Sequence, residues 1–476
     1  MKPCIKLLVF IVLSYLFSAQ AQSAANSDVT FDLGFGGELV ADAWNPLRVT
    51  LRDLGEAELI LELEVGNLRQ GQRTLRYQAE LAGGAGLYTF SDDVYLPNWR
   101  AFSWLVRTSD EVLASGSIER RRADTKPLEL VLARTVSEGN RYYANDRRII
   151  DVLPDDLPER AAAYDGVNSL LVLPSTTPPT AGAVAAAATA GASVVLAGPL
   201  GPAHAALLSL AAQPTQRLGA GWLVRVPSLN EKVVQEGLSH RGLESGVLAA
   251  ALLSPDLTRI PPNPSVMLVL AVLGGYAIVV SLLVRFGRAG GLLAALLLAA
   301  LLSFGTERLR PEALLLTRTR TLSLSAGDLA LETDLDTLFS YPAQVARLPQ
   351  PLRPLDPLAL DLWESGPERF EADLPRYTTT VLLGKPHLNT AALRWEGGAL
   401  VNSGEADLVE VFDTENGTQP NVGAGRTSSQ SNGNLIAPTL YAKLAPLLPA
   451  GSIIARAGGT VYVALPLPEP QPDGGL

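Results

Sequence analysis

Histidine is the side chain best suited to acid–base or metal chemistry, and the chain has three, far apart in the sequence. His204 opens an expected helix, His240 stands beside Ser239, and His387 lies in an expected turn. A serine and a histidine act together only when they face each other, and neighbours on a helix point in different directions. No acidic residue stands at metal-ligand spacing from His387. The sequence therefore predicts no catalytic or metal site at these positions, and His204 is interpreted as a surface residue.

Ser175 is the position that most suggests a ligand site. It follows the apolar run 171–174, and doubly wound sheets bind ligands beyond the carboxyl ends of their strands. Residues 175–179 are equally a helix-start signal, because hydroxyl side chains cap helices and proline suits the first turn. Capping is the favoured interpretation, and ligand contact is the alternative. The chain has no G-x-S-x-G elbow, and Lys385, although preceded by glycine, lacks the Ser or Thr of a phosphate loop.

Paired acids occur at Asp92 and Asp93, at Asp155 and Asp156, and at Asp334 and Asp336. Paired carboxylates can bind calcium or serve as acid and base, but none of these has the spacing of a calcium loop. They are interpreted as solvated turns and strand faces, and the basic run at residues 120–122 as a solvated linker. The sequence thus predicts no catalytic residue, no cofactor and no metal.

The composition limits the class of protein. With 476 residues the chain is long enough for three domains, because single cores rarely grow beyond about 300 residues. The formal net charge of −10 argues against a nucleic-acid partner. The single cysteine, Cys4, falls in the expected leader, so the mature chain can form neither a disulfide nor a cysteine metal site.

Residues 1–21 have the three parts of a secretory signal peptide: lysines, an apolar run and a small-residue end. We expect cleavage after Ala21, with Ala25 as the second choice. Cys4 precedes the apolar run, so no lipid anchor is expected.

A second apolar block predicts a membrane anchor. Residues 265–284 carry no charge, and twenty residues of helix cover the roughly 30 Å of a bilayer core. Arg285 and Arg288 follow, and then a shorter apolar stretch that reaches residue 306. We expect a two-helix transmembrane hairpin over residues 265–306, with these arginines inside and the soluble regions on the outer side of a bacterial inner membrane. Four arginines at residues 308–320 oppose this orientation, and the alternative is a cytoplasmic carboxy-terminal third.

The remaining regions show two kinds of sequence pattern. Residues 28–122 alternate with period two and have glycine pairs and a break at residues 44–46, which predicts an immunoglobulin-type β-sandwich. Residues 126–260 alternate strands (128–133, 169–173, 193–197 and 222–226) with helices (181–190 and 203–212), which predicts a parallel sheet. Residues 312–465 are β-rich, with strands at 317–325 and 407–412. We expect a mobile loop at residues 414–434 and a disordered tail at 466–476. The predicted fold class is a multidomain α+β membrane protein.

The region 126–260 resembles the flavodoxin-like fold of class I glutamine amidotransferase-like domains, in the degenerate form found in large exported bacterial membrane proteins. The resemblance rests on Leu157-Pro158, Tyr164-Asp165, residues 171–174, the helix ending at Gly191 and residues 194–198. It implies a fold. It implies no activity, because the mature chain has no cysteine nucleophile. The order of segments in the whole chain is similar to a family of uncharacterised bacterial envelope proteins, and a likeness at that level carries no reaction with it.

These observations predict a non-catalytic, membrane-anchored cell-envelope scaffold. Its expected partners are the lipid bilayer and other envelope proteins or wall polymers. The alternative is a hydrolase or small-ligand receptor that uses the strand-end cleft near Ser175. A subunit of a transport or secretion assembly is a third possibility.

Overall fold

The structure is a computed structural model, and it describes most of the chain beyond residue 28. The described residues are 29–53, 58–67, 74–82, 86–96, 99–119, 127–133, 136–143, 147–174, 177–252, 274–278, 280–281, 285, 314–341, 344–348, 353–354, 361–366, 369–374, 378–396, 399–429 and 433–467. The predicted signal peptide, the basic run at 120–122, Ser175 and the tail beyond residue 467 lie outside them.

Strands dominate the described part of the chain. Among the described residues no helix has both the length and the apolar character needed to cross a membrane. The described residues therefore contradict the predicted α+β membrane fold with its transmembrane hairpin and the inner-membrane location that depended on it. Apolar length was the only signal for the hairpin. Of residues 265–306, the structure describes only 274–278, 280–281 and 285.

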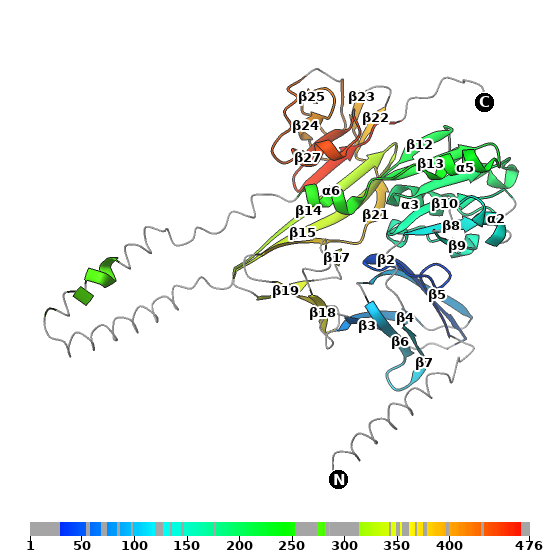
Figure 1. Ribbon diagram of the computed structural model, residues 1–476, viewed down its shortest axis with the longest axis horizontal. Coiled ribbons are helices and arrows are strands. Elements are labelled where there is room, and N and C mark those ends of the chain that lie inside the picture. The colour runs from blue at the N-terminus through cyan, green and yellow to red at the C-terminus, as the bar shows by residue number, and fades with distance from the viewer. Residues whose placement is uncertain are drawn as a thin grey trace, which may run out of the picture.

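The N-terminal region consists of two antiparallel sheets (Figure 1). One contains β1 (Val29–Leu33), β2 (Ala43–Arg52) and β5 (Leu87–Leu96); the other has the order β4 (Thr74–Ala82), β3 (Glu58–Asn67), β6 (Trp99–Arg107), β7 (Val112–Glu119). The expected alternation holds, since Leu59, Leu61 and Leu63 of β3 are buried. The sheets share one core, in which the rings of Phe31 and Trp104 stack with their centroids 4.3 Å apart.

The break expected at residues 44–46 is absent, because these residues lie inside β2. Asn45 is buried, and its side chain accepts a hydrogen bond from the Val40 amide and donates to the carbonyl oxygens of Val40 and Ala43. Pro46 is tolerated because pairing with β1 stops at Leu47, the next residue. The side-chain amide of Asn45 thus links the loop before β2 to the strand.

The middle region is a six-stranded sheet with helices on its faces (Figure 1). Its strand order is β12 (Thr215–Leu218), β13 (Gly221–Val226), β11 (Ser193–Ala197), β10 (Val167–Val172), β8 (Leu128–Leu132), β9 (Arg148–Asp151). Only β12 is antiparallel to its neighbour. β8 and β11 are buried along their whole length, as expected for inner strands of a parallel sheet covered on both faces.

The helical elements of this region are α2 (Val136–Asn140), η1 (Pro154–Asp156), η2 (Ala161–Tyr164), α3 (Ala181–Ala190), η3 (Pro202–His204), α4 (Ala205–Leu210), α5 (Glu231–Leu238) and α6 (Ser245–Ala251). The helix predicted at 181–190 is α3, and the side chain of Thr180 caps it. The helix predicted at 203–212 is shorter and begins as a 3-10 turn.

The C-terminal region is built on a large sheet with two small ones beside it (Figure 1). The large sheet has the order β17 (Arg353–Pro354), β20 (Thr378–Leu383), β15 (Leu329–Tyr341), β14 (Leu314–Ala326), β28 (Thr460–Ala464), β27 (Ile453–Ala457), β24 (Val409–Asp413), β25 (Gly417–Thr418), and β21 (His387–Thr390) also pairs with β15. The small sheets are β16 (Gln344–Leu348), β19 (Arg369–Leu374), β18 (Asp361–Gly366), and β22 (Leu393–Glu396), β23 (Ala399–Asn402), β26 (Thr427–Ser429). The strands predicted at 317–325 and 407–412 correspond to β14 and β24.

The polar segment 414–434 contains structure that the composition did not predict. It holds β25 and β26, and the fully buried Asp413 accepts hydrogen bonds from the amides of Glu415 and Asn416 at its start. In its described residues, an aspartate turn and strand pairing take the place of the missing apolar contacts. The mobility of this segment stays a prediction.

The hydrophobic cores cross the boundaries between the three regions. Leu338 and Leu382 of the C-terminal region belong to the core of the N-terminal sheets. Phe35 and Val40 of the N-terminal region belong to a core of the parallel sheet. Gly166 has φ +89°, and a Cβ there would lie 2.7 Å from Val40. The three regions therefore pack as one body, and the junctions between them position the charged side chains.

Candidate functional site

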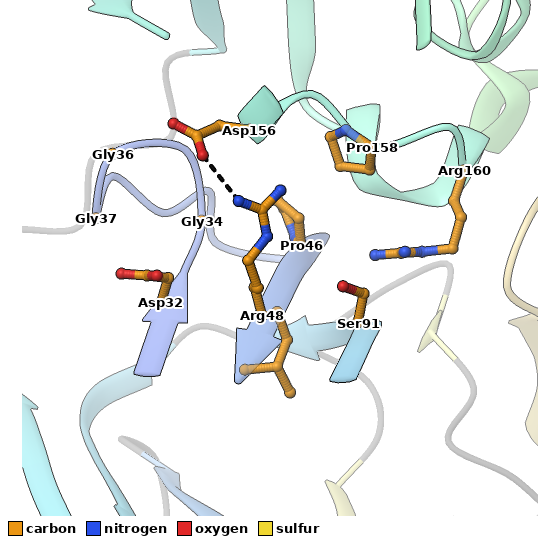
Figure 2. Close-up of a pocket in the computed structure, with 11 residues that line it drawn as sticks. Asp32, Gly34, Gly36, Gly37, Pro46, Arg48, Ser91, Asp156, Pro158 and Arg160 are labelled. Carbon is orange, nitrogen blue, oxygen red and sulfur yellow. Dashed lines mark hydrogen bonds and ion pairs between the residues drawn. The ribbon is translucent and has the colours of Figure 1, made fainter. Parts of the chain in front are cut away.

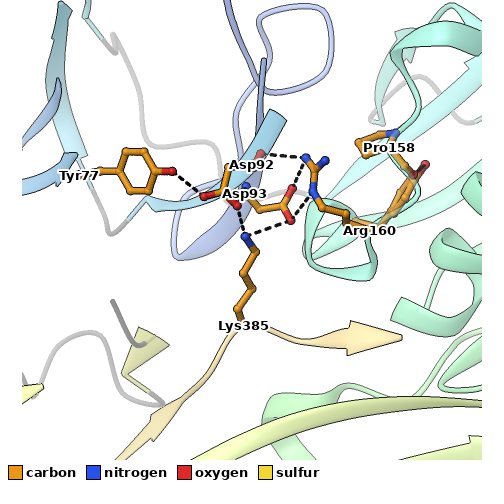
Figure 3. Close-up of polar contacts among 7 residues, drawn as sticks. Tyr77, Asp92, Asp93, Pro158, Arg160 and Lys385 are labelled. Carbon is orange, nitrogen blue, oxygen red and sulfur yellow. Dashed lines mark hydrogen bonds and ion pairs between the residues drawn. The ribbon is translucent and has the colours of Figure 1, made fainter. Parts of the chain in front are cut away.

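The acid pair of β5 lies where the three regions meet, as Figure 3 shows. The side chain of Asp93 is 0% exposed. Arg160, the residue before η2, donates from Nε to Asp93 Oδ2 at 3.0 Å and from Nη2 to Oδ1 at 2.9 Å. This two-pronged contact is the strongest arrangement between a guanidinium and a carboxylate. It joins the N-terminal region to the parallel-sheet region.

Asp92 faces the other way and contacts the C-terminal region. Its Oδ1 accepts a hydrogen bond from the ammonium group of Lys385, which lies between β20 and β21. Its Oδ2 accepts from the hydroxyl of Tyr77 on β4 at 2.5 Å. Lys385 Nζ also lies 3.6 Å from Asp93 Oδ2. Two carboxylates therefore meet two cations, and each cation comes from a different region.

The environment keeps these groups in their charged forms. Burial alone would raise the pKa of Asp92, but hydrogen bonds from Lys385 and Tyr77 outweigh it and lower that pKa below its ordinary value. Burial alone would lower the pKa of Arg160, and Asp93 raises it above its ordinary value. Burial, followed by Asp92, raises the pKa of Tyr77, so its hydroxyl stays a neutral donor. These pKa shifts move Asp92, Arg160 and Tyr77 away from titration near neutral pH. The cluster is therefore suited to holding the three regions together rather than to proton transfer.

A second three-way contact lies at Asp165. Arg353 of β17 donates from Nη1 to Asp165 Oδ2 at 2.6 Å, and the backbone amide of Trp44 in β2 donates to the same oxygen at 3.1 Å. Burial alone would lower the pKa of Arg353, but the charge of Asp165 raises it above its ordinary value. Two separate contacts thus join all three regions.

A cavity of about 190 Å³ lies beside the Asp93 cluster, between the N-terminal sheet and η1 (Figure 2). Arg48 and Arg160 line it, together with Asp32, Ser91 and Asp156. Arg48 donates to the Asp156 carboxylate at 2.8 Å and to the Asp155 carbonyl at 2.6 Å. Both arginines that line this cavity are therefore already bound to carboxylates.

The interpretation of the acid pair at 92–93 as solvated is wrong, because Asp93 is fully buried. Asp155 and Asp156 do lie in a 3-10 turn, and Asp156 forms an exposed ion pair with Arg48. Asp334 and Asp336 lie on β15 and accept hydrogen bonds from the hydroxyls of Thr321 and Thr319 on the neighbouring β14.

The histidines lie in three different surroundings. His204 is buried rather than on the surface, so that interpretation is wrong, and neither ring nitrogen has a hydrogen-bond partner in the described structure. The Nδ1 atom of His240 lies 3.0 Å from the Gly237 carbonyl oxygen. The Nε2 atom of exposed His387 lies 3.4 Å from Glu332 Oε2. Within the described ranges, no group of three or more potential ligands could hold a metal ion.

Sequence reasoning missed Arg160, Tyr77 and Arg353, and it considered Lys385 only for a phosphate loop. One signal was present. Asp92 and Asp93 are adjacent in a strand pattern, so one of the two had to point toward a sheet face that is buried. A buried aspartate needs hydrogen-bond donors or a cationic partner.

The chain matches no family model, and no curated protein matches its sequence. The resemblance to amidotransferase-like domains therefore stays a prediction.

Proposed function

We propose that the chain is a non-catalytic scaffold protein, a rigid three-part body that binds partner proteins at fixed spacing. The observation that carries this proposal is the cluster around Asp93. It joins Arg160 and Lys385, which belong to different regions, to one pair of carboxylates. In some proteins, buried ionic groups fix one arrangement of parts rather than add stability.

The chemistry of the cluster supports binding over catalysis. A catalytic acid or base works best with a pKa near the working pH. The pKa of Asp92 is lowered and that of Tyr77 is raised, both away from neutral pH. The carboxylate oxygens of Asp92 and Asp93 already accept hydrogen bonds from Lys385, Tyr77 and Arg160. They therefore offer little to a substrate.

A crosslinking experiment in the producing cells tests this role. The full chain is crosslinked in intact cells and purified, any partner is identified, and the purified partner is titrated against three forms of the chain. The forms are the wild type, Arg160→Met, and the control Arg48→Met, which removes an exposed ion pair. Circular dichroism checks that each form is folded.

We expect a saturable partner for the wild type and the control, and at least tenfold weaker binding for a folded Arg160→Met. If Arg160→Met does not fold, Lys385→Met takes its place, because it removes the contact with the C-terminal region alone. Recovery of no partner, or equal binding by all folded forms, would contradict the proposal.

A further inference from the structure

A second, larger cavity lies at the amino ends of the parallel strands, with a volume of about 550 Å³. It is lined by Asn168 at the start of β10 and by Gly191 just before β11. This end of the sheet is opposite to the carboxyl end, where Ser175 suggested a site. The volume falls within the roughly 300 to 1,000 Å³ that is usual for small-molecule pockets.

Three arginines from separate parts of the chain line this cavity. Arg147 precedes β9, Arg241 follows α5, and Arg353 lies in β17 of the C-terminal region. A guanidinium offers five N–H donors in a planar fork that matches the oxygens of a carboxylate or a phosphate. We propose that this cavity binds a small organic oxyanion, a molecule that carries carboxylate or phosphate groups.

Two carboxylates hold two of these arginines in place: Glu129 lies behind the cavity wall, and Asp165 lines the cavity. Glu129 is buried, and it accepts hydrogen bonds from Arg147 Nη1 at 3.0 Å and from Asn168 Nδ2 at 2.9 Å. Ser169 Oγ donates to its other oxygen at 2.5 Å. Asp165 holds Arg353 in the same manner. Supporting carboxylates that orient the side chains of the wall are typical of preorganised binding sites.

These contacts use only part of the donor capacity of the arginines. In the part of the chain that the structure describes, Arg147 and Arg353 each donate one side-chain hydrogen bond, and the exposed Arg241 donates none. Their remaining N–H groups are available to a ligand. The cavity beside Asp93 differs, because there Arg160 donates three hydrogen bonds and Arg48 two.

Helix ends offer an ordinary explanation for cations at this place. α3 and α5 both end at the cavity, and cations are stabilised near the carboxyl ends of helices. The carbonyl groups there already have partners: Gly191 N donates to Ala188 O, and Ser193 Oγ donates to Gly237 O. The arginines are therefore not needed to satisfy these carbonyls, which leaves their donors for a ligand.

Isothermal titration of the full chain tests the site. The probes are citrate for carboxylates, inorganic pyrophosphate for phosphates, and trehalose as a neutral molecule of similar size. The variants are Arg147→Gln with Arg241→Gln, and the control is Arg225→Gln, an exposed arginine of β13 that does not line the cavity. Ser239→Trp, in the cavity wall, fills the space without changing charge.

We expect one molecule of citrate or pyrophosphate to bind, and no binding of trehalose. The double variant and Ser239→Trp should weaken binding at least tenfold, and the control should leave it unchanged. Binding of one probe alone identifies the class of oxyanion. If no oxyanion saturates, or if the control weakens binding as much as the double variant, the proposal is wrong. The proposed scaffold role does not depend on either result.

Discussion

The Asp93 cluster and the Glu129 cluster contain the same pair of groups, a buried carboxylate and an arginine, and they differ in geometry. Asp93 receives two N–H groups of Arg160, and Lys385 stands within 3.6 Å. Glu129 receives one N–H group of Arg147, whose side chain is 45% exposed. The first cluster joins three regions of the chain. The second lies within one region and leaves donors facing a cavity.

The pKa shifts follow this difference. In the Asp93 cluster, cationic and hydroxyl donors outweigh burial and lower the pKa of Asp92. In the Glu129 cluster, burial outweighs the hydrogen bonds from Ser169, Asn168 and Arg147 and raises the pKa of Glu129. The donors around Asp92 therefore favour its charged form, whereas burial favours the neutral form of Glu129.

The largest effect is expected when Arg160 is replaced by Met. This change leaves Asp93 buried, with Lys385 at 3.6 Å as the nearest cation. Removing one partner of a buried ion pair costs about 3 kcal/mol or more of unfolding free energy. Chemical denaturation of the full chain measures it. The control Arg48→Met should lose less than about 1 kcal/mol, because its ion pair with Asp156 is exposed. Equal losses in both variants would remove the distinction between the two pairs.

A smaller effect is expected from Lys385→Met. Asp92 keeps its hydrogen bond from Tyr77, and Asp93 keeps Arg160, so the loss is that of one charged hydrogen bond, about 2 kcal/mol. Denaturation against the control Lys443→Met, an exposed lysine, measures the difference. A variant as stable as its control would show that the C-terminal region docks without this contact.

The third prediction concerns acid. The pKa of Asp92 is lower in the folded than in the unfolded chain, so its contribution is present above an unfolded value of about 3.9 and is lost as the pH falls through the folded value. Asp92→Asn should be less stable than the wild type at pH 7, and this difference should shrink as the pH falls below about 4. Denaturation midpoints over this range test it, and a difference that stays constant would count against the assigned charge.

The smallest effect is expected from Glu129→Gln, which keeps the size of the side chain. The pKa of Glu129 is raised by burial, so its contribution is present at low pH and is lost as the pH rises through the folded value. The variant should differ from the wild type by no more than about 1 kcal/mol at pH 7, and its stability should change less between pH 4 and pH 7. The change of stability with pH that Glu129 contributes is opposite in sign to that of Asp92. A variant whose stability changes more steeply with pH than that of the wild type would contradict the raised pKa of Glu129.

Local sequence patterns predicted many of the helices and strands, but they did not predict the contacts between residues far apart in the sequence. The alanine-rich helix α3 and the apolar strand β11 are observed at the predicted residues, because their pattern is complete within each segment. The short strands β9 and β12 were missed, since four residues carry no clear period. The transmembrane prediction relied on apolar length, and most of residues 265–306 lie outside the described residues.

The candidate site could not be predicted for a different reason. Arg160 and Asp93 are 67 residues apart, and Lys385 and Asp92 are 293 apart. No periodicity links positions at such distances, and only the packing of three regions brings them together. The acid pair at 92–93 was noticed, but its burial depends on partners that lie elsewhere in the sequence.

Hydrogen exchange of the full chain tests most directly whether the three regions form one body fastened at Asp93. Exchange of β5, β10 and β15, one strand from each region, is compared between the wild type and Arg160→Met. A single body predicts that protection falls in all three strands together. Loss of protection confined to β5, with β15 exchanging as in the wild type, would contradict it.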